Sequence, residues 1–194
     1  MKLAYTMAPG RGDTDLILFT LAGILSSRGF SCCGTVQINS GNAAAGRCDM
    51  DVQLLPDGPV LRISQDLGRS ARGCRLDAAV LETAVGLVSA RLAGAADVLI
   101  INKFGKHEAE GRGFRSVIAD ALSMDIPVIV GTNPMNLPAF EAFAGGLATC
   151  LPPEPEALAA WLGAFGHVTE KRALVSRMSE SLTRPGAQAV RPSG

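Results

Sequence analysis

The hydrophobic positions of this chain alternate between two patterns. Four short apolar runs have the length of buried strands, and they cover residues 2–7, 31–38, 98–101 and 127–130. Between and after them, apolar residues recur at the three- and four-residue spacing of a helix face. These helical segments cover residues 16–25, 81–92, 114–122 and 158–165. Strands that alternate with helices predict a three-layer α/β domain with a mostly parallel sheet that is covered on both faces.

Two further runs, 51–55 and 60–64, flank the turn sequence Pro-Asp-Gly-Pro at 56–59 and predict an inserted β-hairpin. Beyond residue 168 the chain is polar and rich in Ser and Arg, which is typical of a loosely docked tail. We therefore expect one α/β domain over residues 1–167 and a polar C-terminal tail over 168–194.

The composition excludes several classes of function. Among 194 residues, Lys plus Arg number 18 and Asp plus Glu number 18, so the chain has no excess positive charge for broad nucleic-acid binding. No stretch has the length of a membrane span, and Pro9 and Gly10 end the first apolar run too early for a signal peptide. The odd count of five cysteines indicates reduced thiols. A cytoplasmic protein is expected.

Residues 7–14 read Met-Ala-Pro-Gly-Arg-Gly-Asp-Thr and align with the phosphate-loop template G-x-x-x-x-G-K-[ST]. Gly12 and Thr14 match, Met7 replaces the first glycine, and Asp13 replaces the lysine that contacts the phosphates. The segment lies between an expected strand and an expected helix, as a phosphate loop requires. Phosphate or anion binding is therefore predicted for Gly10, Arg11, Gly12, Asp13 and Thr14. The alternative is an ordinary turn in which Asp13 or Thr14 caps the helix.

A second strand end differs from that of an active enzyme. Phosphate-loop enzymes have an acidic residue there that holds Mg²⁺. In this chain the apolar run 98–101 ends in Asn102-Lys103-Phe104-Gly105-Lys106. An amide is a weak neutral ligand and Lys103 repels a divalent cation, so Mg²⁺ binding is not expected.

Two families resemble the chain. The stretch from Asp97 to Gly131 is similar to the Walker B half of the thermostable nucleoside-triphosphatase family of P-loop proteins, which typically reads Asp-Glu-Ile-Gly-Lys-Met-Glu-Leu there. The residues that match are Gly105, Lys106 and Glu108, and those that depart are Asn102, Lys103 and His107. That family also inserts a β-hairpin between its two Walker motifs, so the resemblance implies a P-loop fold.

The chain up to about Trp161 more closely resembles a bacterial domain family of unknown function. Some of its members are labelled molybdenum ABC-transporter ATP-binding proteins. The segments that carry this resemblance are Arg47-Cys48-Asp49-Met50-Asp51, Arg62-Ile63-Ser64-Gln65-Asp66-Leu67-Gly68, Gly73-Cys74-Arg75-Leu76-Asp77 and Asn102-Lys103-Phe104-Gly105-Lys106. The resemblance implies molybdate handling as a context, whereas the chain lacks the signature sequence and the size of a transporter ATPase.

Four basic residues are candidates for one anion site, because ligands of open α/β sheets bind at the carboxyl ends of the strands. They are Arg11, Lys103, Lys106 and Arg112, and Asn102 is predicted to bind the anion with them. In the alternative arrangement, Asp13 forms a structural ion pair with Lys103 or Lys106 in an empty phosphate site.

Cysteine and histidine offer other chemistry. Cys48 and Cys74 lie beside Arg and Asp and could form a thiol or metal site, or they are two separate loop thiols. Cys32, Cys33, Cys150 and Trp161 are expected in the core. His107 and Glu108 could act as an acid–base pair, although a histidine on a surface loop is the simpler interpretation.

These observations predict a degenerate P-loop-type protein. It would bind a nucleotide or a small oxyanion such as molybdate without efficient hydrolysis, in a regulatory role. One alternative is an active nucleoside-triphosphatase that uses Arg11 or Lys103 as the substitute cation. The other is a non-catalytic interaction module that binds a protein partner or a second copy of the chain.

Overall fold

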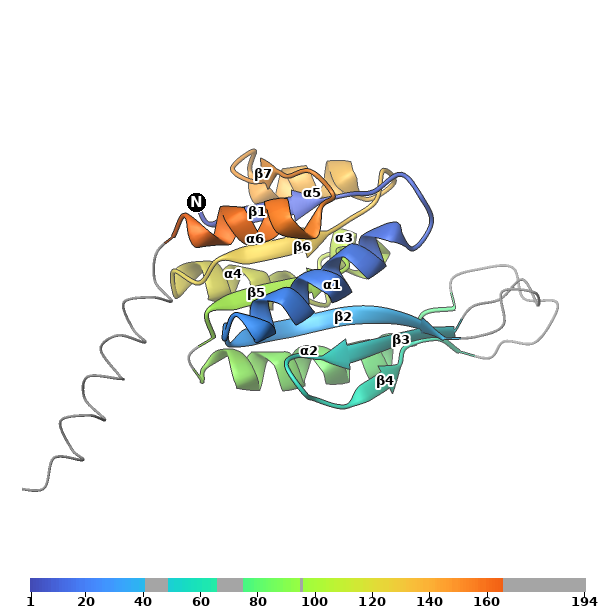
Figure 1. Cartoon of the computed structure of the whole chain (residues 1–194). Helices are drawn as coiled ribbons and strands as arrows, with labels where there is room; N and C mark the ends of the chain where they lie inside the picture. Colours follow the sequence, from blue (N-terminus) through green and yellow to red (C-terminus); the bar gives the residue numbers. More distant parts are fainter. Residues whose placement is uncertain (41–48, 66–74, 95, 166–194) are drawn as a thin grey trace, which may run out of the picture. The chain divides into compact units, whose positions relative to one another are not determined.

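A mixed sheet forms the middle layer of the molecule. The computed structural model describes residues 1–40, 49–65, 75–94 and 96–165, and within these residues the strands have the order β4-β3-β2-β5-β6-β1-β7. Their bounds are β1 Leu3–Thr6, β2 Cys32–Ser40, β3 Asp49–Leu54, β4 Val60–Arg62, β5 Val98–Asn102, β6 Val128–Gly131 and β7 Thr149–Cys150. Neighbouring strands are parallel from β2 to β7, and β3 and β4 form the expected antiparallel hairpin beyond β2 (Figure 1).

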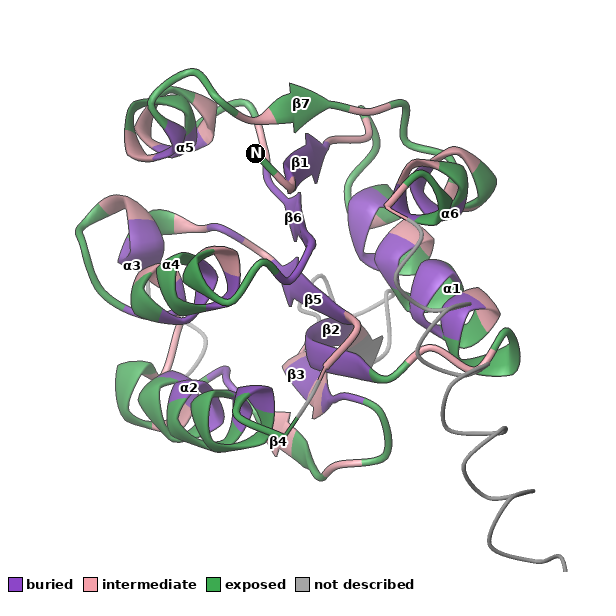
Figure 2. Ribbon diagram, turned by 90° about the vertical axis from the view of Figure 1, so that its left-hand side faces the viewer, coloured by how far each residue is buried: buried purple, intermediate pink, exposed green. Residues whose placement is uncertain are grey.

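Helices cover both faces of this sheet. The helices are α1 Asp13–Ser27, α2 Ala78–Leu92, α3 Lys106–Ala109, α4 Arg115–Ser123, α5 Leu137–Ala144 and α6 Pro155–Gly163. Figure 2 shows α1 and α6 on one face and α2, α3, α4 and α5 on the other. The three-layer architecture expected from the hydrophobic pattern is therefore confirmed.

The buried apolar residues form two clusters, one on each face of the sheet, and β5 contributes side chains to both. Leu99 and Ile101 belong to the apolar cluster under α2 and α4, whereas Val98 and Ile100 belong to the cluster under α1 and α6. Successive side chains of a strand point to opposite faces. Asn102, the last residue of β5, therefore continues the row that faces α1.

The carboxyl ends of three strands lie level with one another. β6 lies between β1 and β5, and its last residue Gly131 is in register with Thr6 on one side and Asn102 on the other. The loop after β1 and the segment after β5 therefore leave the same edge of the sheet, separated only by the end of β6.

Some expectations about individual elements were wrong. Cys150 is exposed, because it lies on the two-residue edge strand β7. Trp161 is only partly buried, against the apolar cluster under α1 and α6. Cys32 and Cys33 are buried on opposite faces of the sheet, as expected. The helices α3 and α5 were not predicted.

Residues 1–164 form one compact unit. The expected tail, 168–194, lies outside the described residues. Within the described part of the chain, every helix is too short or too polar to cross a membrane.

Candidate functional site

The loop between β1 and α1 carries the residues that align with a phosphate loop. Gly12 precedes the helix with a left-handed backbone (φ 88°), a conformation that favours glycine. Asp13 is exposed, and its carboxylate lies against Gly10, so that a Cβ atom at Gly10 would overlap it. Among the described residues no side chain caps the first turn of α1, and the N–H of Asp13 donates to the backbone oxygen of Gly10 at 3.3 Å. The expectation that Asp13 or Thr14 caps the helix was therefore wrong.

Thr14 has a different role in the loop. Its Oγ1 accepts a hydrogen bond from the backbone N–H of Ala8, at 2.9 Å, and the residue is buried. This bond ties the start of the helix back to the chain that leaves β1. The hydroxyl hydrogen of Thr14 stays available as a donor, because a hydroxyl group both donates and accepts.

Gly131 brings the two expected motifs together. A Cβ atom at Gly131 would lie 3.0 Å from Cγ2 of Thr14 and 3.3 Å from Oδ1 of Asn102. The nearest atom to that position is Cδ1 of Leu18, at 2.7 Å, so the atoms packed around the end of β6 leave no room for a side chain at Gly131. The loop before α1 and the end of β5 thus lie close to the same residue at the carboxyl edge of the sheet.

Asn102 is the most unusual polar group of this site. The residue is 2% exposed. Neither its Nδ2 nor its Oδ1 has a hydrogen-bond partner among the described residues. A buried polar group without a partner costs about 1–3 kcal/mol, and such groups are rare in folded proteins. Nδ2 and Oδ1 of Asn102 could therefore form hydrogen bonds with a ligand at the candidate site.

Lys103 does not pair with Asp13. Its Nζ lies 3.3 Å from Oδ1 of Asp15, whose side chain is 5% exposed. The next residue, Phe104, donates its backbone N–H to the oxygen of Gly131 at 2.8 Å, which fixes the chain beside β6. Asp15 was missed by the sequence reasoning, and the only available signal was its place in the first turn of α1.

Two of the other three basic candidates lie in or just after α3. Lys106 and Arg112 both pair with Glu110, at 3.7 and 2.6 Å, so the alternative pair between Asp13 and Lys106 is not formed either. Arg11 is exposed on the loop before α1. The structure thus brings Lys106 and Arg112 together on Glu110 and places Lys103 with Asp15. Anion binding by these residues stays a prediction.

His107 and Glu108 are both buried, so the expectation of a surface histidine was wrong. The ring of His107 bonds with Glu82 on α2 through Nε2, at 2.7 Å. Glu108 instead accepts from the backbone N–H groups of Gly105, at 2.9 Å, and Phe114, at 3.3 Å. Burial raises the pKa of the Glu108 carboxyl group, although these backbone donors oppose the shift. Both residues therefore hold the segment after β5 in place.

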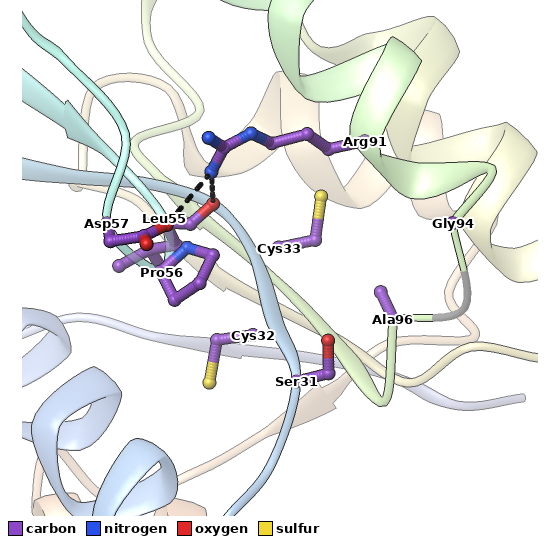
Figure 3. Close-up of a pocket in the computed structure, with 9 residues that line it drawn as sticks. All are labelled: Ser31, Cys32, Cys33, Leu55, Pro56, Asp57, Arg91, Gly94 and Ala96. Atoms are coloured by element: carbon purple, nitrogen blue, oxygen red, sulfur yellow. Dashed lines mark hydrogen bonds and ion pairs between the residues drawn. The ribbon is translucent and has the colours of Figure 1, made fainter.

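The remaining candidates lie elsewhere. Cys48 and Cys74 fall outside the described residues. Within the described ranges, no group of three or more His, Cys, Asp or Glu side chains could hold a metal ion. A cavity of about 240 Å³ lies at the amino ends of β2 and β5, where Arg91 donates to the oxygen of Leu55 at 2.8 Å (Figure 3). This cavity is at the opposite edge of the sheet from Thr14 and Asn102.

The polar and charged groups near Thr14 and Asn102 determine which ligands this edge of the sheet could bind. An uncapped helix N-terminus offers backbone N–H groups and a positive dipole end to an anion. Thr14 and Asn102 add neutral donors and acceptors. The two charged residues that meet here, Asp15 and Lys103, offset each other. The site is therefore suited to binding, and among the described residues it lacks the paired loop lysine and strand carboxylate of a phosphoryl-transfer centre.

Comparisons with known proteins show the family to which the chain belongs. The model of the family described as "Protein of unknown function (DUF2478)" matches residues 3–161. A protein of Bradyrhizobium diazoefficiens described as "Molybdenum import ATP-binding protein ModC 2" is 33% identical over 193 residues, which is 100% of this chain and 21% of that protein. The chain thus spans about a fifth of the length of this relative.

Two solved structures share the fold. The crystal structure of THEP1 from Aquifex aeolicus has a TM-score of 0.59 and 19% identity, and covers 85% of this chain and 96% of its own. The solution structure of a human cancer-related nucleoside triphosphatase has a TM-score of 0.53 and 22% identity, over 77% and 87%. The chain therefore has the fold of the P-loop nucleoside triphosphatases, and both resemblances expected from the sequence are confirmed.

Proposed function

We propose that this chain, which belongs to the DUF2478 family of proteins of unknown function, binds a nucleotide or a small oxyanion without efficient hydrolysis. The ligand lies at the carboxyl edge of the sheet, between the first turn of α1 and the end of β5. The family membership rests on the match over residues 3–161.

One observation carries the proposal. The amide of Asn102 is buried without a partner among the described residues, at the carboxyl edge of the sheet where ligands of open α/β sheets usually bind. The adjoining first turn of α1 is also without a side-chain cap. A ligand that accepts from the helix N–H groups and pairs with Asn102 would satisfy both sets of polar groups at once. A site kept for structural reasons alone would be expected to pair or replace this amide.

The charged groups argue against rapid hydrolysis. Phosphoryl transfer needs a cation on the loop and an acidic residue that holds Mg²⁺. The chain has Asp13 and Asn102 at these places. Lys103, the substitute cation of the alternative enzyme hypothesis, has its charge offset by Asp15 at 3.3 Å. Binding without turnover is the function that these groups support best.

The description of the relative suggests a physiological context. The protein to which this chain is 33% identical is described as a molybdenum import ATP-binding protein, and the chain corresponds to about a fifth of it. We infer a regulatory role in which the domain senses a nucleotide or an oxyanion, molybdate among them, in molybdate handling.

A thermal-shift screen of the full chain tests the proposal. Nucleotides, phosphate, molybdate and tungstate are each added to the wild type and to Asn102→Leu. A ligand at 100 times its Kd stabilises the native state by about 2.7 kcal/mol, which raises the melting temperature. We expect at least one compound to stabilise the wild type and not Asn102→Leu. Gln53→Leu, which removes an amide on β3 away from the site, serves as the control and should behave as the wild type. No shift with any compound would overturn the proposal.

A further inference from the structure

The pairing capacity of Asn102 defines the chemistry of its partner. A carboxamide offers two N–H donors and one carbonyl acceptor, and here both polar atoms are buried and have no partner in the described part of the chain. A ligand that is only an acceptor can satisfy Nδ2, but it leaves Oδ1 facing another oxygen. A partner that satisfies both atoms must present a donor and an acceptor side by side.

The neighbouring helix adds a second requirement. Within the described ranges no side chain caps the N-terminus of the 15-residue α1, and its N–H groups and dipole favour negative charge. Thr14 belongs to this first turn, and its methyl group and Oδ1 of Asn102 both lie close to Gly131. The ligand should therefore carry negative charge toward α1 and a hydrogen-bond donor toward Asn102.

The charges around the site limit how negative the ligand can be. Two carboxylates, Asp13 and Asp15, lie in the first turn of α1, and Lys103 already pairs with Asp15. The carboxylate of Asp13 also lies against Gly10 in the loop. A highly charged polyphosphate would be repelled at this position, whereas an anion that retains a proton can donate to an acceptor.

We propose that the ligand of this site is a protonated tetrahedral oxyanion, of which hydrogen phosphate is the simplest example, and that it binds without a metal ion. Its P–OH group donates to Oδ1 of Asn102, an adjacent phosphate oxygen accepts from Nδ2, and the remaining oxygens face the N–H groups of α1. This inference rests on the proposed function and names the class of ligand. Sulfate and molybdate carry no proton at neutral pH, so they can satisfy only one of the two atoms of the amide.

Calorimetric titration of the full chain at neutral pH, with a chelator present, compares inorganic phosphate, sulfate and molybdate. We expect phosphate to bind at least tenfold more tightly than the other two, because a hydrogen bond to a charged group contributes about that much. Asn102→Leu should lose this affinity, and Gln53→Leu should keep it. A nitrogen-15 spectrum of the wild type should show the side-chain amide of Asn102 shifting on addition of phosphate, which tests the contact even if Asn102→Leu does not fold.

The outcomes separate this inference from the proposed function. Equal affinity for the three anions, or binding of nucleotides alone, would overturn the inference and leave the proposed function standing. Phosphate binding that neither depends on Asn102 nor shifts its resonance would also overturn the inference. The absence of binding by every nucleotide and oxyanion would overturn both.

Discussion

Lys103 and Asp15 form an ion pair, with 3.3 Å between Nζ and Oδ1, that joins the end of β5 to the first turn of α1. A phosphate-loop enzyme has a cation on the loop and an acid at the end of the second strand. This chain has the acid on the helix and the cation after the strand. In the proposed site the signs of these two charges are therefore opposite to those in such an enzyme.

Replacement of Lys103 by Met should destabilise the protein by about 1–3 kcal/mol. Removing one partner of a buried ion pair costs about 3–5 kcal/mol, and we reduce this value because the side chain of Lys103 is 33% exposed. Urea denaturation measures the change, and the double variant Lys103→Met/Asp15→Asn should recover part of it. Lys106→Met, whose side chain is 72% exposed, is the control and should leave stability unchanged. Equal stability of Lys103→Met and the wild type would show that the pair has no structural role.

Purified protein with Mg-ATP or Mg-GTP should release phosphate only at the background rate. Under the proposed function Asp13, Asn102 and Lys103 take the places of the groups that hold Mg²⁺ and the γ-phosphate in phosphoryl transfer. A phosphate-release assay on the wild type and on Thr14→Ala measures this. A turnover of about one per second that Thr14→Ala abolishes would identify an active nucleoside-triphosphatase instead.

Asp13→Lys should create or strengthen triphosphate binding, because it restores the cation of the loop while Gly12 and Thr14 keep their positions. The stability cost should be at most about 1 kcal/mol, since Asp13 makes no capping bond and only the favourable effect of an acid on the helix dipole is lost. Calorimetric titration and a melting curve measure both effects. Asp13→Asn removes the charge without adding a cation and should give a smaller gain. A folded Asp13→Lys variant without any gain would show that the loop is not a phosphate loop.

The sequence was sufficient for the fold because its signals are local. Strand runs such as 98–101 and helical spacing such as 81–92 require no knowledge of tertiary contacts. The helices α3 and α5 were missed because they have four and eight residues, too few for a periodic pattern, and Pro138 lies inside α5. Cys150 was placed in the core because its position on a sheet edge depends on strand order.

The site was predicted only in part. The loop 7–14 and Asn102 were found by alignment with a motif. Their approach depends on Gly131 and on the placement of β6 between β1 and β5, which no local pattern reveals. For the same reason one alternative paired Asp13 with Lys103 or Lys106, when Asp15 is the acid whose position on α1 brings it to Lys103.

The buried Glu108 should make stability depend on pH. Burial raises the pKa of its carboxyl group above the unfolded value of about 4.3. The folded state therefore holds the proton more tightly, so this contribution to stability is fully present below the unfolded pKa and is lost as the pH rises through the folded pKa. Glu108→Gln cannot titrate, so the stability of the wild type relative to this variant should fall as the pH rises from about 4 toward 8.

Urea denaturation of both proteins across this pH range measures the difference, and Glu110→Gln is the matched control. Glu110 lies two residues away, and its hydrogen bond with Arg112 lowers its pKa. Its contribution is present above the unfolded pKa and is lost as the pH falls through the folded one, so its difference curve should rise with pH only near and below about 4 and stay flat above. A flat difference for Glu108→Gln would mean that the carboxyl group titrates alike in the folded and unfolded chains. The two backbone N–H groups of Gly105 and Phe114 would then offset the cost of burying its charge.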